Sequence, residues 1–300
     1  MPTERKHFEP SVRSQFLGSR MRELREGRGL TLKYIATYLG VEFSTLARYE
    51  RAEWPFRRDH VTALLDVYGV YDDPTRAGLM ELAQNAWRIN QWEPTTNQYE
   101  PTGDETVIDD WWVQDRAAEL CVYADLVVPE EVQTRDYAEA LISHTVQQPL
   151  WVDKLVRRQL ERQQALDDKK PPTRLEILLE ESVLHRPVGG RIVLAQQLQH
   201  LNRLAEQRPH VKIRILPTRV GWHAGLDGAF TVCAMQRPYP PVALVHHLDG
   251  RLILEATAAK RYSATFDKLR EVALSPAESF ALIDTIADEI DAGSTNAPAA

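Results

Sequence analysis

Cysteine and long apolar runs are both scarce in this sequence, and each shortage excludes a class of protein. The two cysteines, Cys121 and Cys233, lie far apart, and neither belongs to a CxxC pair or has a histidine at metal-ligand spacing. We therefore interpret both as buried thiols. No run of about 18 apolar residues occurs, which argues against a membrane-spanning helix. No apolar stretch follows Arg5 and Lys6, as a secretion signal would require, so we expect a cytoplasmic protein.

Basic residues are fewer than acidic residues in the whole chain, but they are concentrated in its N-terminal segment. The net charge is -7, whereas residues 1–60 hold 12 Lys or Arg and 8 Asp or Glu, a net charge of +4, which leaves -11 for the remainder. DNA binding depends on neutralising phosphates, so the overall charge alone would argue against it. A basic segment on an acidic body is what a DNA-contacting head would show.

The length of 300 residues favours two domains. Breaker residues gather between Asn90 and Asp104, including Pro94, Pro101 and Gly103, and this composition predicts a linker. We predict a head at residues 11–90, a linker at 91–104 and a regulatory or partner-binding body at 105–290, with flexible tails at 1–10 and 292–300.

The head contains start and stop signals for five short helices. Apolar residues recur at helical spacing from Phe16 until Gly27 and Gly29 end the first helix. Thr31 is a suitable N-cap for a second helix that stops at Gly40. A third helix follows that turn, a fourth starts near Arg57 and Arg58, and Asp73-Pro74 caps a fifth. The pattern predicts an all-α helix-turn-helix head of five helices.

The second helix of such a pair enters the major groove, where its outward residues meet bases and phosphates. Leu46 and Tyr49 are three residues apart and can anchor this helix from inside. We expect Glu50 to pair with an arginine of the first helix rather than to read a base. The predicted DNA-binding residues are Lys33, Phe43, Ser44, Thr45, Ala47, Arg48, Arg51 and Arg57.

Residues 17–70 resemble the XRE-type, phage-repressor-like helix-turn-helix family. The resemblance rests on GLT at 29–31, LGV at 39–41 and STLARYE at 44–50. Many family members have Gln directly after the Thr that opens the second helix, where this chain has Leu32, and Phe43 is bulkier than the polar residue usual at its position. The family therefore implies double-stranded DNA as partner but not which bases are read.

The body alternates strand and helix signals, which predicts a mixed α/β (α+β) domain. The segment at 211–215, VKIRI, alternates apolar and basic residues as a half-buried strand does. Further strands are predicted at 119–123, 126–128, 174–179, 230–235, 242–245 and 252–254. Helices are predicted after Thr134 and at 151–166, 192–204, 258–274 and 276–290, the last with a capping box of Ser275 and Glu278.

The body also resembles a C-terminal domain of unknown function that accompanies XRE-type heads in many actinobacterial regulators, often described as antitoxin-like. The motifs that carry the resemblance are VTALLDVYGV at 61–70, VVPEEVQTRDYAEALI at 127–142, LHRPVGG at 184–190 and VKIRILPTRVGWHAGLDGAF at 211–230. Glu130 and Glu131 stand where the family usually has Gly-Leu in a tight apolar corner. The resemblance implies a regulator whose gene often adjoins one for a small partner protein, with no established catalysis.

The loop at 221–228 is the one place where a hidden enzyme could be suspected. His223 with Asp227 could form a general base, and His223 with His246 or His247 could bind a metal. There is no nucleophile elbow, HExxH or phosphate loop. We expect no enzyme, no catalytic residue, no metal and no cofactor, and we place a ligand or partner site at Trp222, His223 and Asp227, with a purely structural loop as the alternative.

These observations favour a sequence-specific transcriptional regulator that binds a palindromic operator as a homodimer. The body would sense a small partner protein or a ligand. The main alternative is an antitoxin-like interaction module whose head has lost DNA binding, with Leu32 and Phe43 as signs of that loss. An enzyme that uses the 222–227 loop is the third reading.

Overall fold

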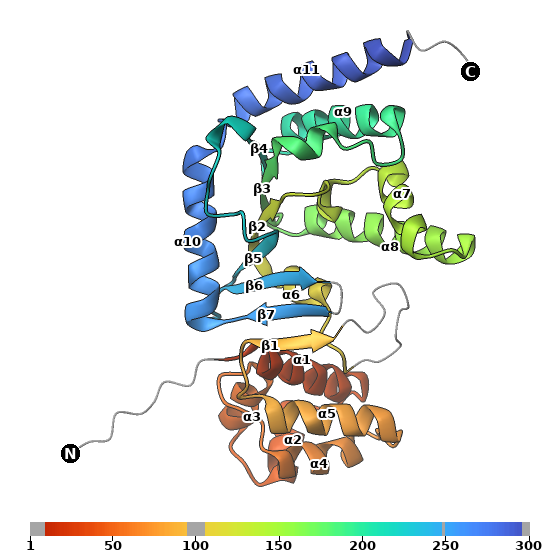
Figure 1. The fold of residues 1–300 in the computed structure, drawn as a ribbon. Helices are drawn as coiled ribbons and strands as arrows, with labels where there is room; N and C mark the ends of the chain where they lie inside the picture. Colours follow the sequence, from red (N-terminus) through yellow and green to blue (C-terminus); the bar gives the residue numbers. More distant parts are fainter. Residues whose placement is uncertain (1–9, 95–105, 248–249, 296–300) are drawn as a thin grey trace, which may run out of the picture.

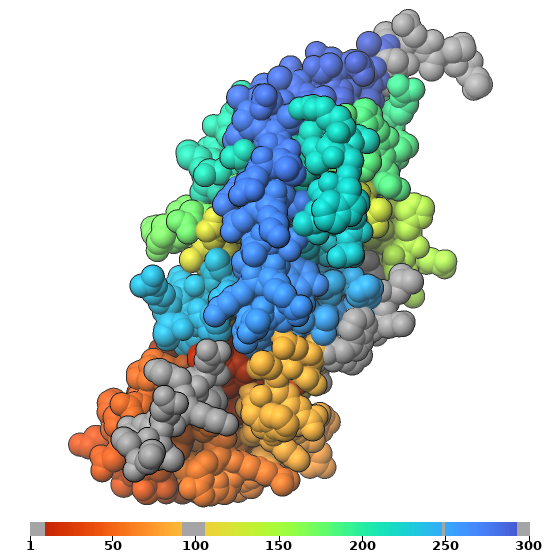
Figure 2. Space-filling model, turned by 60° about the vertical axis from the view of Figure 1, so that its left-hand side comes forward, coloured from red at the N-terminus to blue at the C-terminus, as the bar shows by residue number. Residues whose placement is uncertain are grey.

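A computed structural model describes residues 10–94, 106–247 and 250–295. The N-terminal helices form one lobe, and the sheet with its helices forms a larger lobe above it (Figures 1 and 2). This arrangement confirms the predicted fold class, a helical head followed by a mixed α/β domain. No helix in the described ranges is long and apolar enough to cross a membrane.

Five helices build the head. The caps follow the local sequence: the side chains of Ser11, Thr31 and Asp72 accept hydrogen bonds from backbone amides in the first turns of the first, second and fifth helices. The fifth cap is therefore Asp72 and not Asp73, which lies in the first turn. The helices are α1 (Val12–Gly27), α2 (Leu32–Leu39), α3 (Phe43–Glu50), α4 (Arg58–Val67) and α5 (Asp73–Asn85).

The body contains a seven-stranded sheet in the order β1-β7-β6-β5-β2-β3-β4. β2, β3 and β4 are parallel, and the other strand pairs are antiparallel. β2 is therefore the boundary between a parallel half and an antiparallel half. The strands are β1 (Gln91–Pro94), β2 (Ala117–Ala124), β3 (Arg174–Glu180), β4 (Val211–Leu216), β5 (Phe230–Met235), β6 (Val242–His247) and β7 (Gly250–Leu254).

Helices cover both faces of this sheet (Figure 1). α10 (Ala256–Val272) packs Phe266 and Leu269 on one face, against Phe230 and Leu178. The opposite face receives α6 (Asp110–Asp115), α8 (Pro149–Asp168) and α9 (Arg191–Gln207), with α7 (Arg135–Thr145) beside α8. α11 (Pro276–Thr295) lies on α9 and β4, and its capping box forms as expected, with Glu278 and Ser275 hydrogen-bonded to each other. The described part of the chain also contains three 3-10 turns, at Glu130–Val132, Glu181–His185 and Thr218–Val220.

The structure corrects several expected segments. Residues 91–94, assigned to the linker, form β1 because their backbone pairs with β7; the rest of the linker, 95–104, lies outside the described residues. The predicted strand at 126–128 does not form. The predicted tail at 292–300 begins as helix, since α11 continues through Gly293 to Thr295. Residues 1–9 and 296–300 of the two tails lie outside the described residues.

Head and body share one hydrophobic core. Phe16 of α1 stacks edge-on against Trp112 of α6 with ring centroids 5.0 Å apart. The amide of Val12, at the start of α1, donates to the buried carboxyl group of Glu255 at the start of α10. The hydroxyl of Tyr239, in the turn between β5 and β6, donates to the carbonyl of Arg51 at 2.7 Å. The end of α3 is thus tied directly to the body.

Candidate functional site

α2 and α3 meet across a tight turn at Gly40, whose φ of 66° lies in the left-handed region that favours glycine. Gly40 serves as C-cap of α2, and its amide donates to carbonyls of the same helix. α3 begins three residues later, at Phe43. This is the geometry of a helix-turn-helix pair, with α3 in the position of the recognition helix.

The inner face of α3 is wider than the sequence suggested. Leu46 and Tyr49 are buried as expected, and Glu50 is buried in an ion pair with Arg25 of α1, with Arg25 Nε and Glu50 Oε1 2.6 Å apart. Ala47, expected to contact DNA, is only 8% exposed. The correction follows from helical geometry, because position 47 lies next to 46 and 50 on an eight-residue helix whose inner side is shared by α1.

The other predicted DNA-binding residues are accessible. Thr45 is partly buried, whereas the remainder of the set, Lys33, Phe43, Ser44, Arg48, Arg51 and Arg57, is exposed. Arg51 Nε lies 2.7 Å from Glu53 Oε1, and Arg57 pairs with Asp59. Arg48 stacks on the Trp54 ring at 4.8 Å. The partners of these three guanidinium groups are themselves at least partly exposed, so phosphates could replace the two carboxylates.

Aromatic side chains on this surface were overlooked in the sequence. Tyr34 and Tyr38 lie one turn apart on α2, and both are more than half exposed, as is Phe43 at the start of α3. Their four-residue spacing was the available signal, because aromatic residues one turn apart share a helix face. Large exposed apolar side chains grouped on one element are typical of contact surfaces.

The body contains a second candidate site, a cavity of about 660 Å³. Its walls come from the start of α6, the end of β2 with the segment after it, α7, α8, the start of β5 and the end of β6. The cavity thus lies beside β2, where the parallel and antiparallel halves of the sheet meet. Ligands of open α/β sheets bind outside the carboxyl ends of strands at such a change in strand order.

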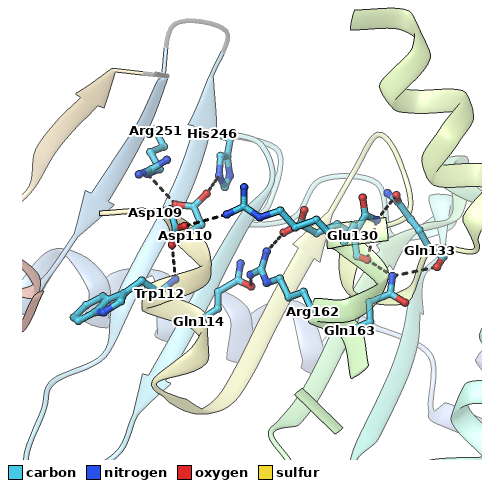
Figure 3. Close-up of polar contacts among 12 residues, drawn as sticks. Asp109, Asp110, Trp112, Gln114, Glu130, Gln133, Arg162, Gln163, His246 and Arg251 are labelled. Carbon is cyan, nitrogen blue, oxygen red and sulfur yellow. Dashed lines mark hydrogen bonds and ion pairs between the residues drawn. The ribbon is translucent and has the colours of Figure 1, made fainter. Parts of the chain in front are cut away.

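One wall of this cavity is a corner at residues 128–134, fixed by glutamine side chains (Figure 3). Gln133 donates to the carbonyl of Val128 at 2.6 Å, and Gln163 of α8 donates to the carbonyls of Glu130 and Gln133. The carboxylate of Glu130 accepts from Arg162 at 2.9 Å. α8 therefore holds the backbone of the corner in one position.

The opposite wall carries a cluster around Asp110 (Figure 3). Its carboxylate oxygens lie 2.5 Å from His246 Nε2 and 2.9 Å from Arg251 Nε. Burial works to raise the pKa of Asp110, but the hydrogen bond from His246 and the charge of Arg251 outweigh it and hold the pKa below its usual value. The same hydrogen bond raises the pKa of His246. The charged groups of this cluster pair with one another, although Asp110 Oδ1 and Arg251 Nε lie in an ion pair without a hydrogen bond.

Within the described ranges, Glu131 lacks the polar partners that the glutamines of the corner and the Asp110 cluster have. Glu131 is 7% exposed and lines the cavity, and its carboxyl group bonds to its own backbone amide but to no other residue of the described chain. Burial, with the neighbouring charge of Glu130, raises its pKa to about 7. A carboxyl group in this setting lacks the partner that buried charges usually have.

The three residues predicted as a ligand or partner site do not come together. Trp222 is 83% exposed, so it does not cover core, while His223 is buried against Glu180 with Nε2 and Oε1 3.1 Å apart. The amide of Gly225 donates to His223 Nδ1, and the Tyr123 hydroxyl donates to the same Glu180 oxygen. Both imidazole nitrogens are engaged in packing the loop. Of the three, Asp227 lines the cavity.

The suspected metal ligands are also apart. His246 bonds to Asp110, whereas His223 bonds to Glu180. Within the described ranges, no group of three or more potential ligand side chains is arranged to hold a metal ion. Cys233 is buried as expected, but Cys121 is partly accessible, and burial raises the pKa of both thiols.

Comparison with known families agrees with this division into two sites. The family described as "Domain of unknown function (DUF5753)" matches residues 111–285, more than half of the chain. The chain belongs to the DUF5753 family. A family described as "Helix-turn-helix domain" matches residues 17–79, which include α2, the turn and α3. No curated protein and no solved structure gives a significant match.

The helix-turn-helix match makes this DUF5753 protein a DNA-binding regulator in outline. The DUF5753 segment contains nearly all of the cavity, from Trp111 through Arg251. Of the cavity residues, the sequence had singled out Asp227 as a site residue and His246 and His247 only as possible metal ligands. Trp111, Glu130 and Glu131 were not proposed, because nothing in their local sequence shows that they meet these residues in space.

Proposed function

We propose that the protein is a sequence-specific transcriptional regulator of the XRE type, which reads a palindromic operator as a homodimer. The main support for this proposal is the exposed face of α3, which presents Phe43, Ser44 and Arg48. The buried residues Leu46 and Tyr49 anchor the same helix from inside. Hydroxyl and guanidinium groups suit base edges and phosphates, and Phe43 suits a thymine methyl group.

Binding of the full chain to genomic DNA fragments at several salt concentrations tests this proposal. We expect one or a few fragments to be preferred over bulk DNA, and Arg48→Ala to weaken the preference by about 1 to 3 kcal/mol if Arg48 reads a base. If Arg48 contacts phosphate, the same variant lowers the salt dependence of binding instead. Arg157→Ala is the matched control, because Arg157 of α8 is an exposed arginine paired with Asp153, as Arg48 is an exposed arginine paired with Glu53. Equal affinity for all fragments would contradict the proposal.

The homodimer is proposed from the geometry of helix-turn-helix recognition, in which half-sites about 34 to 36 Å apart are read by two copies. Sedimentation of the protein on an operator duplex should give two chains per duplex. One chain per duplex at saturation would contradict the proposed homodimer, but it would not contradict the proposed DNA recognition.

The body is proposed to set the DNA affinity of the head by binding a ligand in the cavity. The supporting observation is the hairpin of β5 and β6: Thr231 and Val245 line the cavity, and Tyr239 in its turn bonds to Arg51 at the end of α3. A ligand that fits one arrangement of this hairpin better than another would shift the head with it. This proposal contains no catalytic step.

A small partner protein is the second candidate for the bound molecule. The observation in its favour is that Trp222 and Leu226, in the loop beside the cavity, are both largely exposed. Trp222→Ala tests this reading, since it should abolish the response of operator binding to a protein encoded nearby. An unchanged response would leave the cavity as the sensing site.

A further inference from the structure

The cavity of the body is lined by six acidic and four basic side chains. Arg158 and Arg251 are its two guanidinium groups, and His246 and His247 are its imidazoles. The carboxyl groups are those of Asp109, Asp110, Asp125, Glu130, Glu131 and Asp227. A cavity lined in this way concentrates positively charged molecules, because low-dielectric walls focus the field of the carboxylates.

Half of these carboxylates are already neutralised by the protein. Asp109 lies 3.8 Å from Arg158, Asp110 is paired with His246 and Arg251, and Glu130 is paired with Arg162 (Figure 3). The other half, Asp125, Glu131 and Asp227, have no ion pair within the described chain. Arg158, His246 and Arg251 of the cavity, together with Arg162, thus pair with the first three acids, and no ion pair is present for the second three in the described chain.

Glu131 is the member of the second three that marks the position of a ligand. It is more than nine-tenths buried and lines the cavity, and no group of another described residue bonds to its carboxyl group, which accepts a hydrogen bond only from its own backbone amide. Since buried carboxylates are normally paired, a cation in the cavity would supply the missing partner.

Apolar side chains form the rest of the lining. Leu141, Ile142 and Leu155 contribute from α7 and α8, and Phe230 and Val245 from the sheet. Small-molecule sites typically combine such a surface with a few polar groups that fix orientation, and the volume of about 660 Å³ lies in their usual range.

We propose that this cavity binds an organic cation, an amine or guanidine attached to an apolar group, with its charged end on Glu131. The apolar part would lie against the leucine and isoleucine side chains of α7 and α8, and Asp227 at the exposed side would attract the cation during entry. The inference deepens the ligand-sensing part of the proposed function and rests on it.

A matched ligand series tests the charge. Isothermal titration of the full chain with 4-phenylbutylamine, 4-phenyl-1-butanol and 4-phenylbutyrate compares one skeleton as cation, neutral molecule and anion. We expect the amine to bind at least about tenfold more tightly than either of the others, as a charge-assisted hydrogen bond provides. Equal affinities, preference for the carboxylate, or no binding of any of the three at millimolar concentration would overturn the proposal.

Variants then test whether Glu131 binds the charged end of the ligand. Glu131→Gln keeps the shape of the side chain and should weaken amine binding at least about tenfold, with little effect on the alcohol. Glu139→Gln, an exposed glutamate of α7 outside the cavity, is the matched control and should change nothing. If Glu131→Gln retains full amine affinity and folds normally, the site is elsewhere.

These titrations contain no DNA, so the outcomes separate the two proposals. A protein that selects operator fragments but ignores the amine loses only the inference about the ligand. A protein that binds the amine through Glu131 but shows no preference among fragments keeps the site and loses the regulatory function.

Discussion

Glu50 connects recognition to stability at the scale of single residues. Its side chain is 4% exposed and that of Arg25 is 7% exposed, and the guanidinium makes two bonds to the carboxylate. Arg25 also donates to the carbonyl of Leu30, just before α2 begins. One buried pair therefore holds α1, α3 and the entry to α2 together.

We expect Glu50→Gln to lower the free energy of unfolding by about 3 kcal/mol, because it leaves the Arg25 charge buried without its partner. Urea unfolding followed by circular dichroism measures this loss. Glu26→Gln, which removes an exposed partner of the same arginine, should leave the unfolding curve unchanged. Equal effects of both variants would contradict the importance of burial.

Glu131 and Glu255 make stability depend on pH at the same scale. Burial is the main cause that raises each pKa to about 7. In the unfolded chain both groups ionise near their ordinary pKa. Their contribution to the free energy of unfolding is therefore fully present below about pH 4.5 and is lost as pH rises through about 7. Charges that face Glu131 come from Glu130, Arg162 and His246.

We expect Glu131→Gln to be more stable than the natural protein at pH 8, by up to about 3 kcal/mol, because the amide carries no charge to bury. At pH 5 the two proteins should differ little. Urea unfolding at both pH values gives the comparison. A stability difference that is the same at pH 5 and pH 8 would show that Glu131 does not titrate in this range.

At the scale of elements, the close packing of α1 on α3 positions the recognition helix. A Cβ atom added to Gly18 of α1 would lie 2.7 Å from the carbonyl oxygen of Glu50, closer than atoms pack. Glycine thus allows α1 to approach the backbone at the end of α3. The same end of α3 receives the hydrogen bond from Tyr239 of the body.

We expect Gly18→Ala to destabilise the protein by about 1 to 3 kcal/mol, because the backbone of α3 must move. Gly27→Ala, at the last residue of the same helix, meets nothing within 4 Å and should be neutral or slightly stabilising. Thermal unfolding of the two variants provides the measurement. Equal melting temperatures would mean that α1 and α3 can separate without cost.

At the scale of the whole molecule, the contacts between head and body bear on regulation. Phe16 and Trp112 share the core, Arg116 donates to Ser19 at 2.7 Å, and Tyr239 donates to Arg51. The first two hold α1 against α6, whereas the third reaches α3 from the hairpin that lines the cavity. Movement of that hairpin would therefore be transmitted to the recognition helix.

We expect Tyr239→Phe to increase amide hydrogen exchange at the end of α3 about fivefold, since one hydrogen bond contributes about 1 kcal/mol. Mass spectrometry of peptides that span residues 48–54 would detect the change. Tyr71→Phe removes a hydroxyl whose bond stays within the head and is the control. If exchange in these peptides is unchanged, the hairpin does not restrain α3.

The sequence determined the local features of this protein. Thr31, Gly40 and the Ser275 capping box act on neighbours within a few residues, so the head helices, the turn and the last helix could be predicted from adjacent residues. The inward position of Ala47 could not, because it depends on how α1 covers α3. β1 likewise depends on pairing with a strand some 160 residues later in the chain.

Only the tertiary structure decided what the body brings together. The strand order places β2 beside β5, and with it the corner at Glu131, the cluster of Asp110 and His246, and the start of β5 surround one cavity. The same packing leaves Trp222 exposed, buries the neighbouring His223, and engages both nitrogens of that histidine, one with Glu180 and one with the amide of Gly225. The physical reason is that hydrogen bonds between strands and burial of side chains are set by partners distant in the chain, for which a sequence carries no local signal.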